Sequence, residues 1–367
     1  MSVTLGSDVF VPEVIADITT DILFRDTPLV NSPYVADGSP AIYRDGSNTL
    51  TFPYWDTNKS VIMQDQVETR TGVTPSKISM DYYTVEVNNK IVSFDFSENM
   101  LEDILQTANP NAHVAEIVAS ESRIEIQGRL IEQAESSPLM DEANYLSATP
   151  ANQLLTVDSI LRAKMIWGEK AAGAVPGLFV HSKQFTDLAQ SDDFKKLGTV
   201  TTNNAIVQAQ APQGAVAMVH GCLVYLLDSV TRKGGDVVSI TRSDDDATVT
   251  TAAAHRFRVG DKVVLSGATQ SEYNGTHTIT AVPAATTFVY ETSGTPATPA
   301  TGSPVIAPRY ESLFLLPEAL WLVIKSGMKT QEHAHPGSVV ITQDFKFRYA
   351  TTLRRVNPRR AVRFSTR

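Results

Sequence analysis

Residues 236–306 differ in composition from the chain on either side, and this difference limits the possible folds more than any other feature. Thr, Ala, Ser, Gly and Val dominate the segment, and helix-forming runs are missing from it. Alternating stretches separated by turn residues within 247–294 predict four or five short strands, and Asn274-Gly275 suits a tight hairpin turn. A Pro/Thr/Ala-rich stretch at 295–304 is typical of a linker. We therefore predict a small β-sandwich or barrel, long enough to fold alone, inserted into a loop of a larger domain.

The sequence around the insertion alternates between helical and strand-like segments, which predicts an α/β layer. Before the insertion we predict a capped helix at 156–173, a buried strand at 177–182, a helix at 182–190 and one or two strands at 215–229. After it, the same texture resumes at 310–325 and ends in a long strand at 338–356. The inserted domain therefore occupies a loop of this layer, where its two ends can lie close together.

The N-terminal part of the chain predicts extended structure rather than a compact core. A short helix is predicted at 12–24, and a polar stretch follows it. Within 49–96 apolar residues alternate with period two, as in strands, on both sides of a polar section at 56–77. This section is too long for a tight turn, so it would form the tip of a long two-stranded arm. Such an arm is marginally stable in water, which indicates that another chain supports it.

A long helix is predicted from about Asn111 to Ser136. Its apolar residues fall on one stripe at helical spacing, namely Val114, Ile117, Val118, Ile124 and Ile131. The opposite face is charged and carries Glu116, Arg123, Glu125, Arg129 and Glu132. At about 1.5 Å per residue the helix would be roughly 37 Å long.

The chain is acidic as a whole but has a basic C-terminal end. Its 367 residues carry a formal net charge of −9, yet residues 346–367 hold eight basic residues and no acidic one. An acidic chain is a poor candidate for sequence-independent binding of nucleic acid, because neutralising phosphates needs clustered Lys and Arg. The basic end favours contact with a partner subunit, with a salt-bridged surface strand or nucleic acid as alternatives.

No catalytic or cofactor-binding motif stands out, and we predict no enzyme activity, no cofactor and no metal site. Glu332, His333 and His335 lie close together, but the Pro-Gly pair after them indicates a loop. His181 is predicted to be structural, and Cys222, the only cysteine, a buried and inert thiol. The sequence shows no signal peptide and no apolar run long enough to span a bilayer, which favours a cytoplasm-like compartment.

Six stretches carry a resemblance to one known fold. They are FVPEVIADITTDILFRDTPLV (10–30), NTLTFPYW (48–55), YYTVEVNNKIVSFDF (82–96), HVAEIVASESRIEIQGRLIEQ (113–133), LTVDSILRAKMIWGEKAAGAVPGLFVHSKQFTDLAQ (155–190) and FKFRYATTLRRVNP (345–358). In this order they resemble the N-arm, the two sides of the extended loop, the spine helix, the apical domain and the closing strand of the major capsid protein of tailed bacteriophages, the Hong Kong 97-type fold.

The resemblance implies an α+β fold with an all-β insertion, either immunoglobulin-like or a barrel. Its parts would be an N-terminal arm (1–47), an extended β-hairpin loop (48–96), a spine helix with peripheral domain (97–152), an apical α/β domain (153–235, continued at 307–335), the inserted β domain (236–306), and a peripheral C-terminal strand with a basic tail (336–367). The subunit-contact candidates lie on the extended loop, the helix and the basic end: Tyr54, Trp55, Lys59, Arg70, Tyr83, Glu125, Arg129, Arg354, Arg355, Arg359 and Arg360.

The function implied by the resemblance is structural. The chain would assemble into the icosahedral head, first the procapsid and then the mature capsid, around the double-stranded DNA genome of a tailed phage. Hexamers and pentamers of the chain, a scaffolding protein, a portal and a decoration protein would be its partners, and it would be a virion protein assembled in the host cytoplasm. The inserted domain would be displayed outside. Two alternatives remain, an encapsulin-like nanocompartment shell and a glycan-binding protein acting through the inserted domain.

Overall fold

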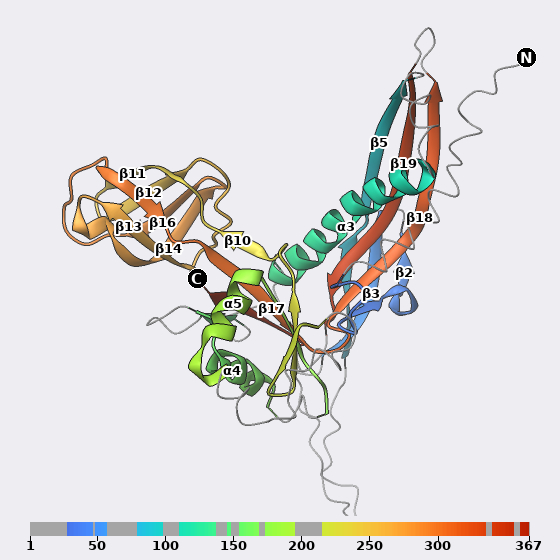
Figure 1. The fold of residues 1–367 in the computed structure, drawn as a ribbon, viewed down its shortest axis with the longest axis horizontal. Helices are drawn as coiled ribbons and strands as arrows, with labels where there is room; N and C mark the ends of the chain where they lie inside the picture. The colour runs from blue at the N-terminus through green and yellow to red at the C-terminus, as the bar shows by residue number, and fades with distance from the viewer. Residues whose placement is uncertain are drawn as a thin grey trace, which may run out of the picture.

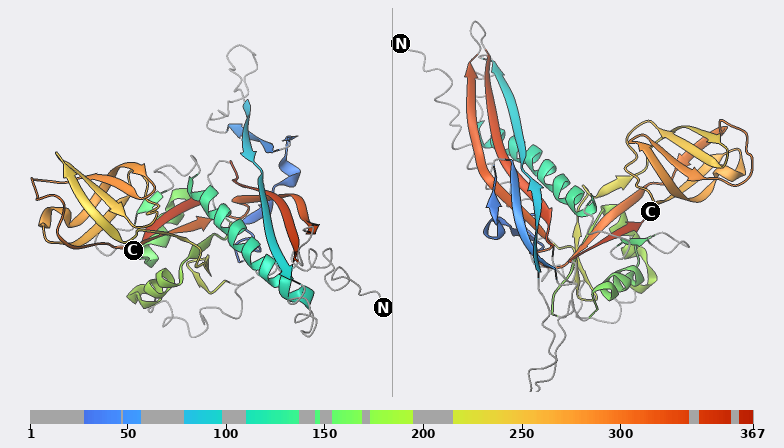
Figure 2. Two further views of the ribbon diagram at one scale, coloured as in Figure 1. Left: turned by 90° about the horizontal axis from the view of Figure 1, so that it is seen from above. Right: turned by 180° about the vertical axis from the view of Figure 1, so that it is seen from behind.

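The computed structural model describes residues 28–46, 48–56, 79–97, 110–136, 145–147, 154–168, 173–194, 215–334, 340–355 and 360–366. Figure 1 shows a long helix lying across a tall sheet, an α/β part beside them, and a separate β module. Both views in Figure 2 place the tall sheet and the module at opposite ends of the molecule. The described chain is therefore a mixed α+β protein with an inserted β domain, as predicted.

The tall sheet has four strands in the order β1-β18-β19-β5. They are β1 (Val35–Asp37), β18 (Leu320–Ala334), β19 (Val340–Leu353) and β5 (Asn88–Ser97), with β1 parallel to β18 and the other neighbours antiparallel. Helix α3 (Pro110–Ser136) crosses one face of this sheet, as Figure 1 shows. The core between them includes Ile126, Leu130, Phe347 and Tyr349. The long helix is thus confirmed at nearly the predicted bounds.

The buried stripe of α3 differs from the predicted one. Val118 and Ile131 are buried, but Ile117 is 40% exposed and Ile124 is 58% exposed. Besides Ile126 and Leu130, the buried face of α3 includes small residues at helical spacing, such as Ala115, Ala119, Ser122 and Ala134. The two exposed isoleucines, Ile117 and Ile124, are left on the outer side of the helix. The apolar residues of α3 therefore lie partly on its buried face and partly on its solvent-exposed face.

The extended loop begins as a three-stranded sheet, β2-β3-β4, which we call the ribbon base. Its strands are β2 (Arg44–Asp45), β3 (Thr49–Asp56) and β4 (Ser79–Glu86), preceded by a 3-10 turn, η2 (Ser39–Ala41). Only Val87 separates β4 from β5, so one chain segment passes from the ribbon base into the tall sheet. Residues 57–78, the expected tip, lie outside the described residues.

The ribbon base packs on its own subunit, which the sequence did not predict. Leu50, Phe52 and Tyr83 share a core with Val323 and Ala350 of the tall sheet. The rings of Phe52 and Trp321 lie 5.4 Å apart, centroid to centroid. The inward-facing residues of the alternating pattern therefore cover the sheet of the same chain, at least at the base of the arm.

The α/β part is a seven-stranded sheet covered by two helices. Its order is β6-β20-β17-β7-β9-β8, and β10 pairs with β17 beside that path. The strands are β6 (Tyr145–Ser147), β20 (Ala361–Thr366), β17 (Arg309–Leu315), β7 (Gly177–Val180), β9 (Cys222–Leu226), β8 (Ala217–Val219) and β10 (Thr231–Lys233), and the helices are α4 (Val157–Trp167) and α5 (Ser182–Gln190). The predicted starts of α4 and α5 and the predicted buried strand, β7, are confirmed. Helix α4 ends earlier than predicted because Gly168 adopts φ 53°.

The last four strands, β17 to β20, divide between the two sheets in a way that the expected segments did not predict. We expected 307–335 to continue the apical part, but within it only β17 joins the seven-stranded sheet, whereas β18 pairs with β19 in the tall sheet. We expected 336–367 to be peripheral, but β20 pairs with β17 from Tyr310 to Leu315 in the seven-stranded sheet. The chain crosses between the two sheets after each of β17 and β19, so both C-terminal segments contribute to both sheets.

The inserted module is a single six-stranded antiparallel sheet in the order β11-β12-β15-β14-β13-β16. Its strands are β11 (Val237–Ser243), β12 (Asp246–Thr251), β13 (Lys262–Ala268), β14 (Gly275–Ala284), β15 (Thr287–Glu291) and β16 (Gly302–Ile306). An isolated bridge between Asp236, the residue before β11, and Val305 of β16 brings the two ends of this strand order together, so the sheet closes on itself. Of the two expected forms, this closure corresponds to a barrel rather than to the two packed sheets of an immunoglobulin domain.

Two local predictions for the module are wrong. Asn274 does not form a tight turn with Gly275, because the chain makes a 3-10 turn, η6 (Ser271–Tyr273), and the Asn274 side chain then bonds both backbone groups of Ala268. The stretch expected to be a linker is part of the barrel. Its Ala300 N–H donates to the Ile240 carbonyl, and its Ala297 carbonyl accepts from the Tyr273 hydroxyl.

Candidate subunit-contact regions and a buried charged junction

Tyr54, Tyr83 and Arg355 come together at the ribbon base. The Arg355 guanidinium carbon lies 4.5 Å from the ring centroid of Tyr83 and 5.4 Å from that of Tyr54. The Tyr54 hydroxyl donates to Asp81 Oδ2 over 3.0 Å, and this bond is the largest reason that the pKa of Tyr54 is raised. Cation–π contacts of this kind fix the ribbon base to the end of β19.

Arg354 and Arg360, two further described residues of the basic end, also have partners within the chain. Arg354 forms an ion pair with Glu318 and lies over the Trp321 ring at 5.4 Å. Arg360 donates to the Pro317 carbonyl over 2.6 Å. Among the expected contact residues, Lys59, Arg70 and Arg359 lie outside the described residues, and of Trp55 only the backbone, in β3, is described.

Glu125 and Arg129 form a charged cluster on α3. Glu125 Oε1 lies 2.6 Å from Lys90 Nζ of β5 and 3.1 Å from Arg129 Nε. Arg129 also pairs with Glu132 at 2.8 Å. Burial raises the pKa of Glu125, but the bonds from Lys90 and Arg129 outweigh it, and the net pKa is lowered. These charges therefore tie the helix to the edge strand of its own subunit.

Exposed apolar side chains mark surfaces that we did not predict. Tyr43 and Tyr82 stand on the outer side of the ribbon base, with ring centroids 4.7 Å apart. Ile117 and Ile124 lie on the outer side of α3, and Met165 of α4 is 77% exposed. Grouped apolar side chains in water are typical of surfaces that bind protein. Tyr82 could have been found from the strand pattern, because it must face away from the inward-facing Tyr83.

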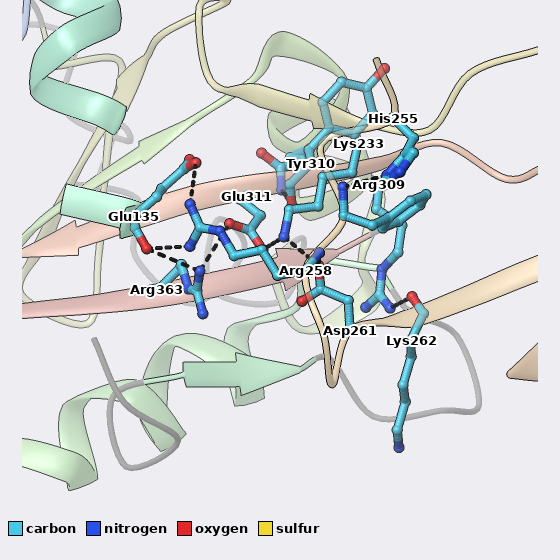
Figure 3. A network of polar contacts seen from close by, with 12 residues as sticks. Glu135, Lys233, His255, Arg258, Asp261, Lys262, Arg309, Tyr310, Glu311 and Arg363 are labelled. Atoms are coloured by element: carbon cyan, nitrogen blue, oxygen red, sulfur yellow. Dashed lines mark hydrogen bonds and ion pairs between the residues drawn. The ribbon is translucent and has the colours of Figure 1, made fainter. Parts of the chain in front are cut away.

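Charged residues gather where α3, the α/β sheet and the module meet, and we call this group the charged junction. All of its side chains are buried except that of Arg258, which is 37% exposed. Its members are Glu135 of α3, Lys233 of β10, Arg258 and Asp261 of the module, Arg309 and Glu311 of β17, and Arg363 of β20 (Figure 3). They come from five separate segments of the chain. The signal available in the sequence was Glu311 itself, a carboxylate two residues before the apolar run LFLL (313–316).

Arg258 connects the module to the end of α3. Its guanidinium donates to the Glu135 carbonyl and lies 3.9 Å from the Glu135 carboxylate. Arg363 donates to the same carbonyl over 3.2 Å. Burial first, and then the neighbouring Glu311 carboxylate, raise the pKa of Glu135, and with all neighbours counted it reaches about 7. A buried carboxylate at a helix C-terminus is unfavourable, so these two arginines compensate for the helix dipole as well as for Glu135.

The residues considered for chemistry have structural roles in the described chain. His181 caps α5, accepting from the Lys183 N–H over 3.1 Å. Cys222 is buried, and burial raises the pKa of its thiol to about 11. Within the ranges that the structure describes, which exclude His335, no three His, Cys, Asp or Glu side chains gather as a metal site would require. No described helix is both long and apolar enough to cross a membrane.

Comparison with known proteins rests on the fold. No protein-family model and no curated sequence matches this chain. Among solved structures, the capsid of Ralstonia phage GP4 matches with a TM-score of 0.52 and 12% identity, covering 92% of this chain and 87% of that one. The head structure of Helicobacter pylori bacteriophage KHP40 matches with a TM-score of 0.51 and 8% identity, covering 90% and 86%. The chain has the fold of a tailed-phage capsid protein.

This Hong Kong 97-type fold accounts for the main elements described above. Helix α3 lies within the segment expected to form the spine helix, and β3 and β4 lie within the segment expected to form the extended loop; the division of the chain into these named parts stays a prediction. The predicted fold class is thus confirmed.

Proposed function

We propose that this chain is the structural subunit of the icosahedral head of a tailed phage, and that it encloses double-stranded DNA. The observation that carries the proposal is a capsid-protein fold matched over about nine-tenths of the chain in two solved phage structures. The exposed apolar groups of the ribbon base, α3 and α4 support it, because a shell subunit needs several contact surfaces. Its partners are further copies of the chain in hexamers and pentamers, a scaffolding protein, a portal and a decoration protein, and its location is the virion, assembled in the host cytoplasm.

Electron microscopy of the purified protein, expressed alone and with its scaffolding partner, tests this proposal. Closed shells with a portal vertex and packaged DNA are the expected result. Shells filled with protein cargo would instead favour the encapsulin-like alternative. A chain that stays monomeric under every assembly condition would contradict both.

Point variants can test which surfaces make the shell. Ile124→Asp places a charge on the outer side of α3, where the side chain is 58% exposed, so the subunit should fold but not assemble. Val238→Asp on the module, 65% exposed, is the matched control and should assemble normally if the module is displayed outside. Charge reversal at Arg354 and Arg355 is also expected to block assembly. Because Arg355 lies over the Tyr83 ring, reversing its charge would also loosen the ribbon base of the same subunit.

We also propose that the module is displayed on the outer surface of the shell. Deleting 236–306 and joining the ends should then leave a subunit that still assembles, and failure of a folded deletion variant would show that the module supports the lattice. The glycan-binding alternative has little support, because all four aromatic residues of the module, Phe257, Tyr273, Phe288 and Tyr290, are buried. Exposed rings are what a sugar would stack on.

A further inference from the structure

Lys233 lies between two buried carboxylates in the charged junction. Its Nζ is 2.6 Å from Asp261 Oδ2 and also contacts Glu311 Oε1, as the dashed lines of Figure 3 show. The side chains of Lys233, Asp261 and Glu311 are 2%, 7% and 0% exposed. An amine, a carboxyl group and a second carboxylate are thus held in contact with almost no access to water.

Each of the three side chains is held in place by a different segment of the backbone. Strand β10 pairs with β17 in the register Thr231↔Glu311 and Lys233↔Arg309, so Lys233 and Glu311 share one face of the sheet. Asp261 is held by the module, where the Arg258 N–H donates to its Oδ2 over 2.8 Å and its own N–H donates to the Arg258 carbonyl over 3.1 Å. Lys233 stands just before the module and Asp261 inside it, so their contact spans the connection between body and module.

This arrangement contains the parts that amide formation requires. Lys233 is a nucleophile in contact with a carboxyl group, and groups held in contact react as if at very high concentration. Glu311 touches the amine and can carry protons to and from it. The Arg258 N–H already donates to the carboxyl oxygen on which negative charge would develop.

We infer that Lys233 and Asp261 form an amide bond between Nζ and Cγ, with Glu311 as the proton carrier. Glu311 takes a proton from the ammonium and delivers it to the Asp261 carboxylate, which leaves a neutral amine and a neutral carboxyl group. The amine nitrogen attacks Cγ, the new C–N bond forms, and a second proton passes through Glu311 to the hydroxyl that departs. In sum, –NH3⁺ and –COO⁻ become –NH–CO– and one water, with no oxidant and no further reactant.

The product suits its surroundings better than the reactants do. Burying an ammonium and a carboxylate costs desolvation energy that their attraction repays incompletely, whereas an amide carries no charge. Glu311 stays negative after the reaction and keeps Arg363 as a partner, at 3.5 Å from its Oε2. The bond would close a covalent loop from Lys233 to Asp261 and fasten the module to the body, whether or not the subunit is part of a shell.

Intact-mass spectrometry of the purified, full-length chain tests the inference directly. The expected mass is lower by one water than the mass calculated from the sequence, and proteolysis should release a branched peptide that joins the segments around Lys233 and Asp261. Lys233→Arg and Glu311→Gln should both restore the full sequence mass. Lys325→Arg is the control, because Lys325 pairs with Asp45 away from the junction, and it should keep the deficit of one water.

The wild-type mass decides the matter even if a variant fails to fold. If the folded wild-type chain has its full sequence mass, Lys233 and Asp261 form only an ion pair, and the inference is wrong. The measurement is made on unassembled subunits as well as on shells, so a chain that forms no shell still gives an answer.

Discussion

Replacing Glu135 with glutamine should stabilise the folded subunit at neutral and alkaline pH. In the charged junction the pKa of Glu135 is raised from 4.5 to about 7, chiefly by burial and next by the nearby Glu311 carboxylate. A hydrogen bond with Thr231 and the positive charges of Lys233 and Arg258 lower the pKa by less than burial raises it. The neutral acid is therefore the form that the folded subunit accommodates best.

The magnitude follows from the linkage between proton binding and folding. At about 1.4 kcal/mol per pKa unit, the interval from 4.5 to about 7 corresponds to roughly 3 kcal/mol as an upper value. Because the folded-state pKa lies above the unfolded one, this stabilisation is complete below pH 4.5 and is lost as the pH rises through about 7. Glutamine cannot ionise, so Glu135→Gln should raise the free energy of unfolding by up to that amount at about pH 8 and change it little at about pH 4.

Urea denaturation of the unassembled subunit, followed by tryptophan fluorescence at both pH values, measures the effect. Glu132→Gln is the matched control, because its side chain lies three residues earlier on α3 and is 58% exposed. It should change the free energy of unfolding by no more than about 0.5 kcal/mol, through its surface pair with Arg129. Equal pH profiles for the wild type and Glu135→Gln would refute the reasoning.

Two glycines offer steric tests of the fold. A Cβ at Gly177 would lie 2.3 Å from the Tyr34 ring, so Gly177→Ala should cost roughly 1–3 kcal/mol in thermal or urea unfolding, and an unchanged midpoint would contradict the packing of Tyr34 on β7. Gly267 adopts φ +85°, and its Cβ would lie 2.3 Å from the Ser303 carbonyl oxygen. Gly267→Ala should therefore destabilise the module by at least about 1–2 kcal/mol, seen as faster hydrogen exchange in its strands, while Gly327→Ala, whose Cβ would meet nothing within 4 Å, should be neutral.

The sequence predicted where helices and strands occur better than it predicted which strands pair with one another. Thr156 and the apolar pattern after it placed the start of α4 correctly, and its side chain does accept from the Ser159 N–H. The period-two alternation predicted β4 and β5. It could not show that these two strands, separated only by Val87, belong to different sheets. Pairing depends on which distant strand offers a complementary face, and local patterns carry no information about that choice.

The candidate contact residues show the same limit. We predicted from their charge that Arg354 and Arg355 contact another subunit. In the structure Arg354 pairs with Glu318 and Arg355 lies over Tyr83, both of the same chain. An arginine and its acceptor can be far apart in sequence, so composition alone cannot tell an internal partner from an external one. The charged junction was missed for this reason, since its seven members come from positions between 135 and 363.

The position of β19 has a consequence for how the chain can be made. Among the described strands β5 pairs with β19 alone, and β6 pairs with β20 alone, so both early strands depend on residues beyond 339. While the polypeptide is being synthesised, the edge of β5 and the part of α3 that packs on β19 therefore stay uncovered until β19 has been made. Long-range pairing of this kind is slow, and a transcript truncated before Val340 yields a product that cannot complete the tall sheet.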